Sequence, residues 1–182
     1  MMTSRQRVLA ALHLEEPDKV PFMDYVNDGI RNELMQGEAS DEAEFAKTIK
    51  MDAIYFLDYC APLFCEGGAS AGADNSEPDF IGEGKIKTEK DLAMMVFPDP
   101  HEESFYDNAK KFVEQYGDSD LALYAGIRPF GIFNTIFSMG MVDFSYALYE
   151  NRKLVDDIMD KYVEWNSVVV EKLQTLGIDF FM

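Results

Sequence analysis

The sequence predicts an α/β protein, the first half of an eight-stranded (β/α)8 TIM barrel, on the basis of three observations. Short apolar stretches alternate with single helical patterns along the chain, which is the order typical of a parallel sheet covered by helices. We count four such strands, or about four βα units, in 182 residues, whereas a closed barrel takes about 250 residues. The chain also ends in the apolar stretch IDFFM, which would need neighbours on both sides to leave water. We therefore expect one domain over residues 1–182, truncated at its carboxyl end.

The first third of the chain is predicted to form three helices and two strands. Thr3 or Ser4 lies at a helix start, and Gln6 follows Thr3 by three residues, as in a capping box. The stretch VPFMDYV has a Pro near its start, where a strand tolerates one, and this strand would end at about Asp24. The predicted elements are helices at residues 3–12, 28–36 and 40–49, the last one beginning at Ser40, and strands at 20–26 and 51–58.

The rest of the chain opens with a long loop at residues 61–85, rich in Gly, Ala, Ser, Pro and Asp. Loops of this length are more often functional than idle. Asp99 as a cap, Pro100 at the first helical position and Gly117 as a stop predict a helix after it. The last long helix repeats apolar residues at spacings of three and four, which favours core packing over a cofactor platform. The predicted elements are helices at 88–91, 99–117 and 151–176 and strands at 121–127 and 178–181, with residues 128–141 not assigned.

The composition argues against several classes of partner. A formal net charge of −18 disfavours binding to nucleic acid or to an anionic membrane, because both interactions need an excess of Lys and Arg. No apolar run in the sequence reaches the about 20 residues of a membrane helix, and no signal segment opens the chain. Because Cys60 and Cys65 are the two cysteines of the sequence, we expect a cytoplasmic protein with reduced thiols.

Candidate site residues lie where each predicted strand turns polar, because barrel active sites are built at the carboxyl ends of the strands. These residues are Asp24 and Tyr25 at the end of the first strand, Asp58 at the end of the second, and Gly126 and Arg128 at the end of the third. An acid such as Asp58 is costly among apolar neighbours unless it is paired or solvated, so Asp58 is the candidate catalytic residue. It could equally cap a loop amide. Arg128 could hold the carboxylate or phosphate of a ligand, or it could pair with Asp58 or Asp24.

The sequence gives little support for a metal or phosphate site. Cys60, Cys65 and Glu66 are close in sequence, but their spacing and the absence of a nearby His favour thiols without a role. The Gly-rich stretch EGGASAGAD is not followed by the helix that would help to bind a phosphate. We therefore predict no metal ligands within this chain.

The opening stretch TSRQRVLAALHLEEPDKVPF resembles the amino-terminal signature of the uroporphyrinogen decarboxylase superfamily. The likeness continues in DAIYFLD, which is similar to the family's second strand with its terminal Asp, and in GIRPFGIFNTIFSMGM with the helix after it. This resemblance covers the whole chain. It implies a (β/α) barrel that is considerably longer than the present sequence.

The superfamily contains two main chemistries: cofactor-free decarboxylation of a tetrapyrrole, and methyl transfer between corrinoid proteins and small methylated substrates or thiols. The decarboxylases carry Arg-Gln-Ala-Gly-Arg after the first strand, where this chain reads FMDYVNDGIRNEL and Arg31 is not in register. Asp58 matches their essential Asp, while their essential Tyr falls on Thr135, next to Asn134. The resemblance thus implies a catalytic role for Asp58 and substrate contacts by Asn134 and Thr135.

These departures favour the corrinoid-linked methyltransferase branch, whose members bind zinc through His and Cys residues in a carboxyl half that this sequence does not include. We expect a small-molecule substrate and a corrinoid protein as partners. The resemblance implies zinc and a corrinoid (cobalamin) for a longer parent enzyme, no cofactor within this chain, and no catalysis by the 182 residues alone. Two alternatives stay open. One is a decarboxylase with altered substrate contacts, and the other is a non-catalytic half-barrel that completes its sheet as a homodimer through the last strand.

Overall fold

A computed structural model describes residues 1–35, 41–59, 61, 64–65, 83–127 and 131–182, without the side chains of Asp28 and residues 57–59. The chain divides into two compact units. The first unit comprises residues 1–59, 102–126 and 170–182, and the second comprises residues 60–101 and 127–169.

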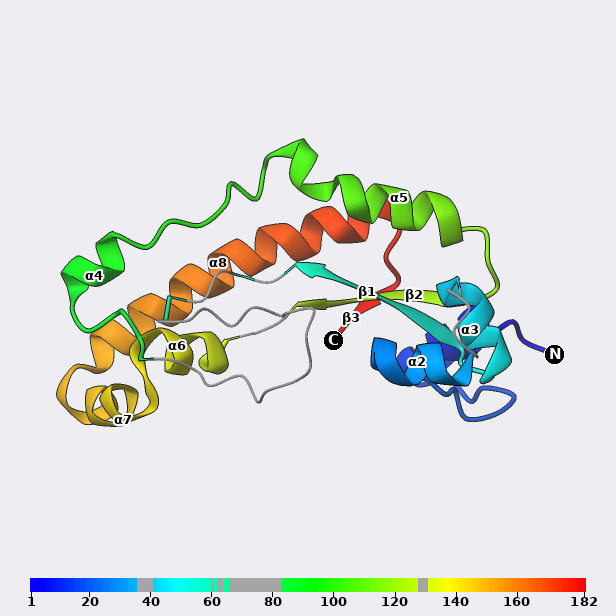
Figure 1. Cartoon of the computed structure of the whole chain (residues 1–182), viewed down its shortest axis with the longest axis horizontal. Coiled ribbons are helices and arrows are strands. Elements are labelled where there is room, and N and C mark those ends of the chain that lie inside the picture. Colours follow the sequence, from blue (N-terminus) through cyan, green and yellow to red (C-terminus); the bar gives the residue numbers. More distant parts are fainter. Residues whose placement is uncertain (36–40, 60, 62–63, 66–82, 128–130) are drawn as a thin grey trace. The chain divides into compact units, whose positions relative to one another are not determined.

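The first unit is organised around a small parallel sheet with the strand order β1-β2-β3, which Figure 1 shows. Its strands in the described part of the chain are β1 (Ala53–Tyr59), β2 (Ala122–Ile127) and β3 (Phe180–Phe181). Strand β2 is buried along its whole length, as expected for a strand with neighbours on both sides. It pairs in parallel with β3, with Tyr124 opposite Phe180. The strands predicted at residues 51–58, 121–127 and 178–181 are thus confirmed, whereas the half-barrel stays a prediction.

The described helices of the first unit are α1 (Ser4–Leu12), α2 (Asp28–Leu34), α3 (Glu42–Thr48), the 3-10 helix η1 (Glu103–Tyr106), α5 (Asp107–Tyr116) and the end of α8 (Arg152–Leu176). Three of them, α1, α2 and α3, begin at residues whose side chains cap them. The predicted capping box of Thr3 and Gln6 is confirmed at α1. Asp41 caps α3 through its carboxylate, one residue after the predicted start at Ser40, which lies outside the described residues.

The predicted first strand at residues 20–26 is wrong, because this segment has no regular secondary structure. It meets the start of β1 through one residue: Phe22 accepts a backbone hydrogen bond from the Asp52 amide at 2.6 Å and donates its own amide to the Asp52 carboxylate at 2.9 Å. The neighbouring Pro21 has no amide proton with which to extend a ladder. Val20 is 85% exposed, and the segment packs on the core of the unit through Met23.

The helix predicted at residues 99–117 also begins later than expected. Asp99 accepts a hydrogen bond from the backbone amide of His101 at 2.9 Å, which forms a local turn in place of a helix cap. The helical structure then starts as the short η1 and continues as α5, which ends at Tyr116 before Gly117. The predicted stop at Gly117 is therefore confirmed and the predicted start is wrong.

The core of the first unit lies on both faces of the sheet. On one face, Val8 of α1 packs with Ala53, Ala122 and Tyr124, and Tyr55 and Phe180 cover part of this cluster. On the other face, Phe56 of β1 contacts Phe112 of α5, with ring centroids 4.9 Å apart. Successive strand residues point to opposite faces. Tyr55 therefore packs in the cluster on one face of β1, and Phe56 packs against α5 on the other face.

The second unit consists of helices packed around the first part of α8. The others in its described residues are α4 (Glu89–Ala93), α6 (Ile132–Met139) and α7 (Met141–Glu150). Gly140 separates α6 from α7 with φ of +84°, a conformation that suits glycine. The apolar stripe predicted on α8 is confirmed as core, with its members in this unit buried: Leu154, Ile158, Tyr162, Trp165 and Val169.

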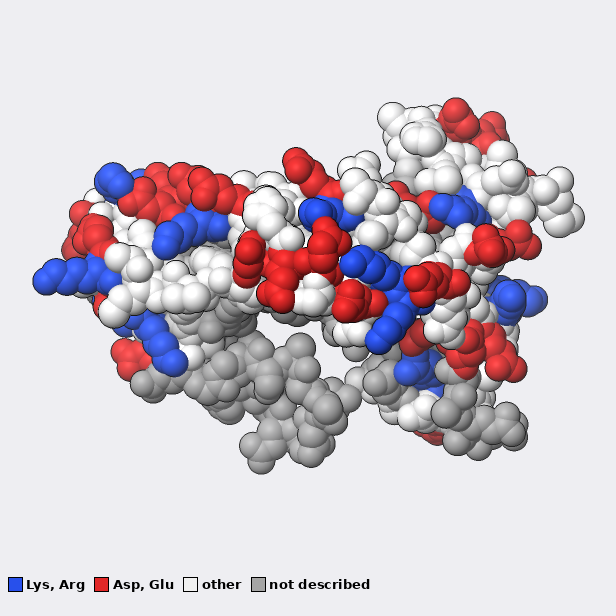
Figure 2. Space-filling model, turned by 90° about the horizontal axis from the view of Figure 1, so that it is seen from above, with Lys and Arg blue, Asp and Glu red and all other residues white. Residues whose placement is uncertain are grey.

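The surface reflects the acidic composition of the chain. Figure 2 shows more acidic than basic side chains on the face in view, in keeping with the net charge of −18. Among the described helices, none has both the length and the apolar character to cross a membrane.

Candidate functional site

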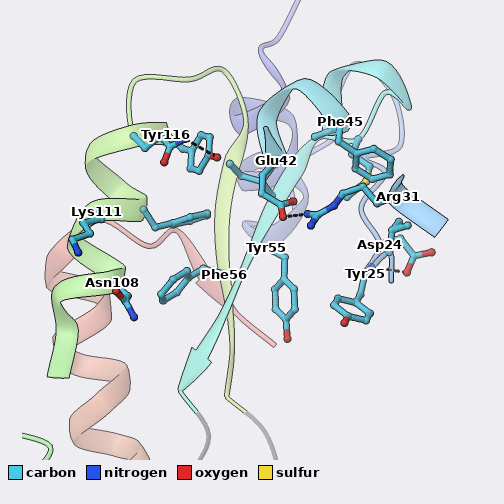
Figure 3. Close-up of a pocket in the computed structure, with 16 residues that line it drawn as sticks. Asp24, Tyr25, Arg31, Glu42, Phe45, Tyr55, Phe56, Asn108, Lys111 and Tyr116 are labelled. Carbon is cyan, nitrogen blue, oxygen red and sulfur yellow. Dashed lines mark hydrogen bonds and ion pairs between the residues drawn. The ribbon is translucent and has the colours of Figure 1, made fainter. Parts of the chain in front are cut away.

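A cavity of about 510 Å³ opens in the first unit beside β1. Its volume falls in the range of about 300–1,000 Å³ that is typical of small-molecule sites. Figure 3 shows this cavity with α5 on one side of β1 and Arg31, Asp24 and Tyr25 on the other. The lining residues are Asp24, Tyr25, Val26, Arg31, Glu42, Phe45, Ala46, Met51, Ile54, Tyr55, Phe56, Asn108, Lys111, Phe112, Gln115 and Tyr116.

Three consecutive strand residues, Ile54, Tyr55 and Phe56, supply the wall of the cavity on β1. Helices α3 and α5 both pack on this strand, and they contribute further apolar side chains, among them Phe45 and Phe112. Aromatic rings therefore dominate the apolar part of the lining. Such rings offer a ligand a large contact area and little conformational freedom to lose.

The polar part of the cavity is organised by an ion pair. Arg31 on α2 donates from its guanidinium to the carboxylate of Glu42, which lies in the first turn of α3. The carboxylate of Asp24 accepts a hydrogen bond of 2.8 Å from the backbone amide of Tyr25 and is exposed. A ligand would therefore meet an exposed carboxylate at Asp24 and a charge-compensated pair at Arg31 and Glu42.

Tyr116 closes the cavity at the end of α5 and is held by a second acid. Its hydroxyl donates to Asp41 at 3.1 Å, and Asp41 also accepts a hydrogen bond of 3.0 Å from the side-chain amide of Gln115. Burial, together with this hydrogen bond to the Asp41 carboxylate, raises the pKa of Tyr116 to about 12. The phenol is therefore protonated at neutral pH and acts as a hydrogen-bond donor.

A row of aromatic rings runs from the cavity across the sheet. Tyr25 meets Tyr55 edge-on with centroids 5.5 Å apart, Tyr55 stacks on Tyr124 at 4.9 Å, and Tyr124 stacks on Phe180 at 5.0 Å. Gly126 leaves room for this row, because a Cβ atom there would lie 2.2 Å from the Tyr55 hydroxyl oxygen. This close approach gives a physical reason for a glycine at the end of β2.

The structure brings part of the predicted site together. Asp24 and Tyr25 line the cavity, and Gly126 contacts Tyr55 in the same unit. The backbone of Asp58 belongs to β1, but its side chain lies outside the described residues, as does the whole of Arg128. The catalytic role of Asp58 and the ligand-binding role of Arg128 stay predictions.

The remaining predicted residues, Asn134 and Thr135, belong to α6 of the second unit and are fully buried. Thr135 donates its hydroxyl back to the carbonyl oxygen of Gly131 at 3.4 Å. Their side chains are enclosed by protein, so a substrate could contact them only after a rearrangement around α6.

Several cavity residues carry no signal of their own in the sequence. Glu42 reads as an ordinary first-turn acid of a helix, and Phe45 and Phe112 read as core positions of amphipathic helices. They come from segments that are distant in sequence, so their meeting depends on tertiary packing. The alternation along β1 is the signal that could have indicated one aromatic residue on each face of the strand.

The described residues do not form a zinc site. No three of their His, Cys, Asp or Glu side chains are close enough together to hold a metal ion. Cys65 is a free, buried thiol, and Cys60 and Glu66 lie outside the described residues.

Comparison with known proteins supports the fold. No family model matches the sequence, and no curated protein matches it. The chain is similar to the solved structure of a methyltransferase from Methanosarcina mazei, with a TM-score of 0.70 and 17% sequence identity. The match covers 100% of this chain and 58% of that chain, so this chain spans little more than half of its neighbour. The chain therefore shares the α/β fold of that structure over its own length.

Proposed function

We propose that this chain is part of a methyltransferase-type enzyme that moves a methyl group between a small substrate or thiol and a corrinoid protein. The observation that carries the proposal is the likeness of the whole chain to a methyltransferase structure at a TM-score of 0.70. The resemblance in the opening sequence stretch and in DAIYFLD supports the corrinoid-linked branch of the uroporphyrinogen decarboxylase superfamily.

The cavity beside β1 would hold the methyl-bearing substrate. Tyr25 and Tyr55 offer it an aromatic wall on one face of β1, which suits an apolar group such as a methyl because burial removes apolar surface from water. The exposed carboxylate of Asp24 could orient a polar end of the substrate. Zinc and a corrinoid are implied for a longer parent, but the described residues do not fit a zinc site, so we derive no step through either group.

The test is a methyl-transfer assay on the product of the whole source gene. The protein is incubated with methylcobalamin, zinc and a panel of thiol acceptors, and loss of the methylcobalamin absorbance is followed together with the methylated product. Turnover that requires the protein supports the proposal. Absence of turnover from the folded, zinc-supplied protein with every acceptor would overturn it.

A substitution in the cavity separates its contribution from that of the fold. Tyr25→Ala removes an edge of the aromatic wall, and we expect kcat/KM to fall about tenfold, equivalent to about 1.4 kcal/mol of transition-state contact. Tyr149→Ala is the matched control, because Tyr149 is 93% exposed and lies in the second unit, outside the cavity. Equal activities of the two variants would argue against substrate binding in this cavity.

A further inference from the structure

Four polar side chains from two helices lie in the interior of the second unit. Asn134 and Ser138 come from α6, and Tyr162 and Asn166 come from α8. Their exposed fractions are 0% for the first three and 1% for Asn166. The hydroxyl oxygens of Ser138 and Tyr162 are 2.7 Å apart and share a hydrogen bond. This polar cluster is enclosed, although most of the buried residues described in this unit are apolar.

The two asparagines are related to this hydrogen bond by helix geometry. Asn134 precedes Ser138 by four residues, and Asn166 follows Tyr162 by four residues, so each amide shares a helix face with one of the bonded hydroxyls. Burial raises the pKa of Tyr162 to about 12, and contacts with Ser138 and Asn134 act in the opposite direction. The contact of Asn134 does not reach the geometry of a hydrogen bond.

Both carboxamides lack partners in the described part of the chain. The amide nitrogen and oxygen of Asn134, and those of Asn166, are buried without a hydrogen bond. A buried polar group without a partner is strongly unfavourable, and native proteins satisfy such groups with protein or with ordered water. Two such carboxamides within one helix pair therefore call for hydrogen-bond partners beyond the described side chains.

The chemistry of the cluster decides which ligand fits. Each carboxamide has a donor and an acceptor, so a ligand must both accept and donate hydrogen bonds. A cation would contact the amide oxygens and leave both NH2 groups unsatisfied, and the buried polar residues described in this unit include no carboxylate to balance its charge. An anion would leave the amide oxygens unsatisfied. Water meets both requirements and typically makes about three hydrogen bonds inside proteins.

We propose that ordered water binds inside the second unit between α6 and α8, hydrogen-bonded to the carboxamides of Asn134 and Asn166. This internal water site goes beyond the proposed methyl transfer and does not depend on it. It gives the buried polar residues of α6 a structural role in helix packing. It also explains how two fully buried asparagines are tolerated between these helices.

The experiment is a measurement of water contacts by NMR on the full, isotope-labelled chain. Side-chain NH2 signals of Asn134 and Asn166 are assigned by their loss in Asn134→Leu and Asn166→Leu, and their NOE and ROE cross-peaks to water are recorded in the unchanged protein. We expect NOE and ROE peaks of opposite sign, the signature of water with a long residence time. Asn151 is the control, because its amide donates to Glu89 at 2.9 Å in an exposed pair and should contact only rapidly exchanging water.

The same NMR measurement can refute the internal water site. If neither NH2 group shows a long-lived water contact, no ordered water binds at the two carboxamides, and the proposal is refuted. The water contacts are recorded on the unchanged protein, and the Leu variants serve only to assign the two NH2 signals. A failure of methyl transfer would leave the measurement unchanged.

Discussion

Arg7 and Asp52 form a buried ion pair beneath the start of β1. The guanidinium Nη1 of Arg7 lies 2.5 Å from the carboxylate Oδ1 of Asp52, and the two residues are 5% and 1% exposed. Asp52 also accepts hydrogen bonds from the hydroxyl of Ser4 at 2.7 Å and from the amide of Phe22 at 2.9 Å. The carboxylate of Asp52 thus connects helix α1 and the segment around Phe22 to the start of β1.

The first prediction concerns the stability that this carboxylate provides. Asp52→Asn removes the negative charge and leaves the buried guanidinium of Arg7 with Asp18 as its remaining acidic partner, so the free energy of unfolding should fall by about 3 kcal/mol. Lys19→Gln is the control, because the ammonium of Lys19 is 3.9 Å from Asp52 and exposed, and such pairs contribute about 0–1 kcal/mol. Chemical denaturation measures both, and equal losses would contradict the prediction.

The second prediction is a loss of stability in acid that depends on Asp52. Burial alone would raise the pKa of Asp52, but the hydrogen bonds from Phe22, Ser4 and Arg7 outweigh it and hold the pKa below the ordinary value of 3.8. The folded carboxylate is therefore harder to protonate than the unfolded one, so its stabilisation is complete above pH 3.8 and is lost as the pH falls through the lower, folded value.

Unfolding experiments between about pH 2 and pH 6 test this sign. The wild-type free energy of unfolding should decline towards the acid end, and Asp52→Asn should flatten that decline. An acid limb of the same slope in the variant would assign the effect to other carboxylates, such as Asp18, whose pKa is also lowered by its hydrogen bond with Arg7.

The sequence predicted the fold correctly where an element depends on residues close to it in the sequence. The capping box of Thr3 and Gln6 satisfies amides within one helical turn, and the apolar stripe of α8 follows from its own periodicity. The predicted strand at residues 20–26 failed because a strand requires a partner, and this segment makes one backbone bond to Asp52 where a ladder was expected. Its composition could not reveal that the pairing does not continue.

The candidate site was predictable only in part for the same reason. Asp24 and Tyr25 were found because they follow an apolar stretch, and they do line the cavity. The Arg31–Glu42 pair joins two separate helices, and the contact of Gly126 with Tyr55 joins two strands. Such pairs depend on the tertiary fold, which no local pattern encodes.

The third prediction tests the contact between Gly126 and Tyr55. A Cβ at position 126 would lie 2.2 Å from the Tyr55 hydroxyl oxygen and 2.9 Å from its nearest ring carbons, so the ring must move. Gly126→Ala should destabilise the protein by about 1–3 kcal/mol, as overpacking does. In a Tyr55→Ala background the same substitution should cost little, since the ring is gone. A double-mutant cycle measures the coupling, and additive effects of the two substitutions would refute the contact.

The last prediction concerns the alkaline titration of two buried phenols. Burial is the main cause that raises the pKa of Tyr116 and of Tyr162 from 10.0 to about 12. The folded phenols hold their protons to higher pH than the unfolded ones, so their stabilisation is complete below pH 10 and is lost as the pH rises towards 12.

An absorbance titration of tyrosinate should show a late phase near pH 12, and Tyr116→Phe and Tyr162→Phe should each reduce its amplitude. Asp41→Asn separates the two phenols, because the Asp41 carboxylate raises the pKa of Tyr116 through a hydrogen bond and its charge and makes no contribution to that of Tyr162. In this variant the Tyr116 part of the late phase should move to lower pH while the Tyr162 part stays. If both parts moved together, the variant would have loosened the fold as a whole, and the specific role of Asp41 would be refuted.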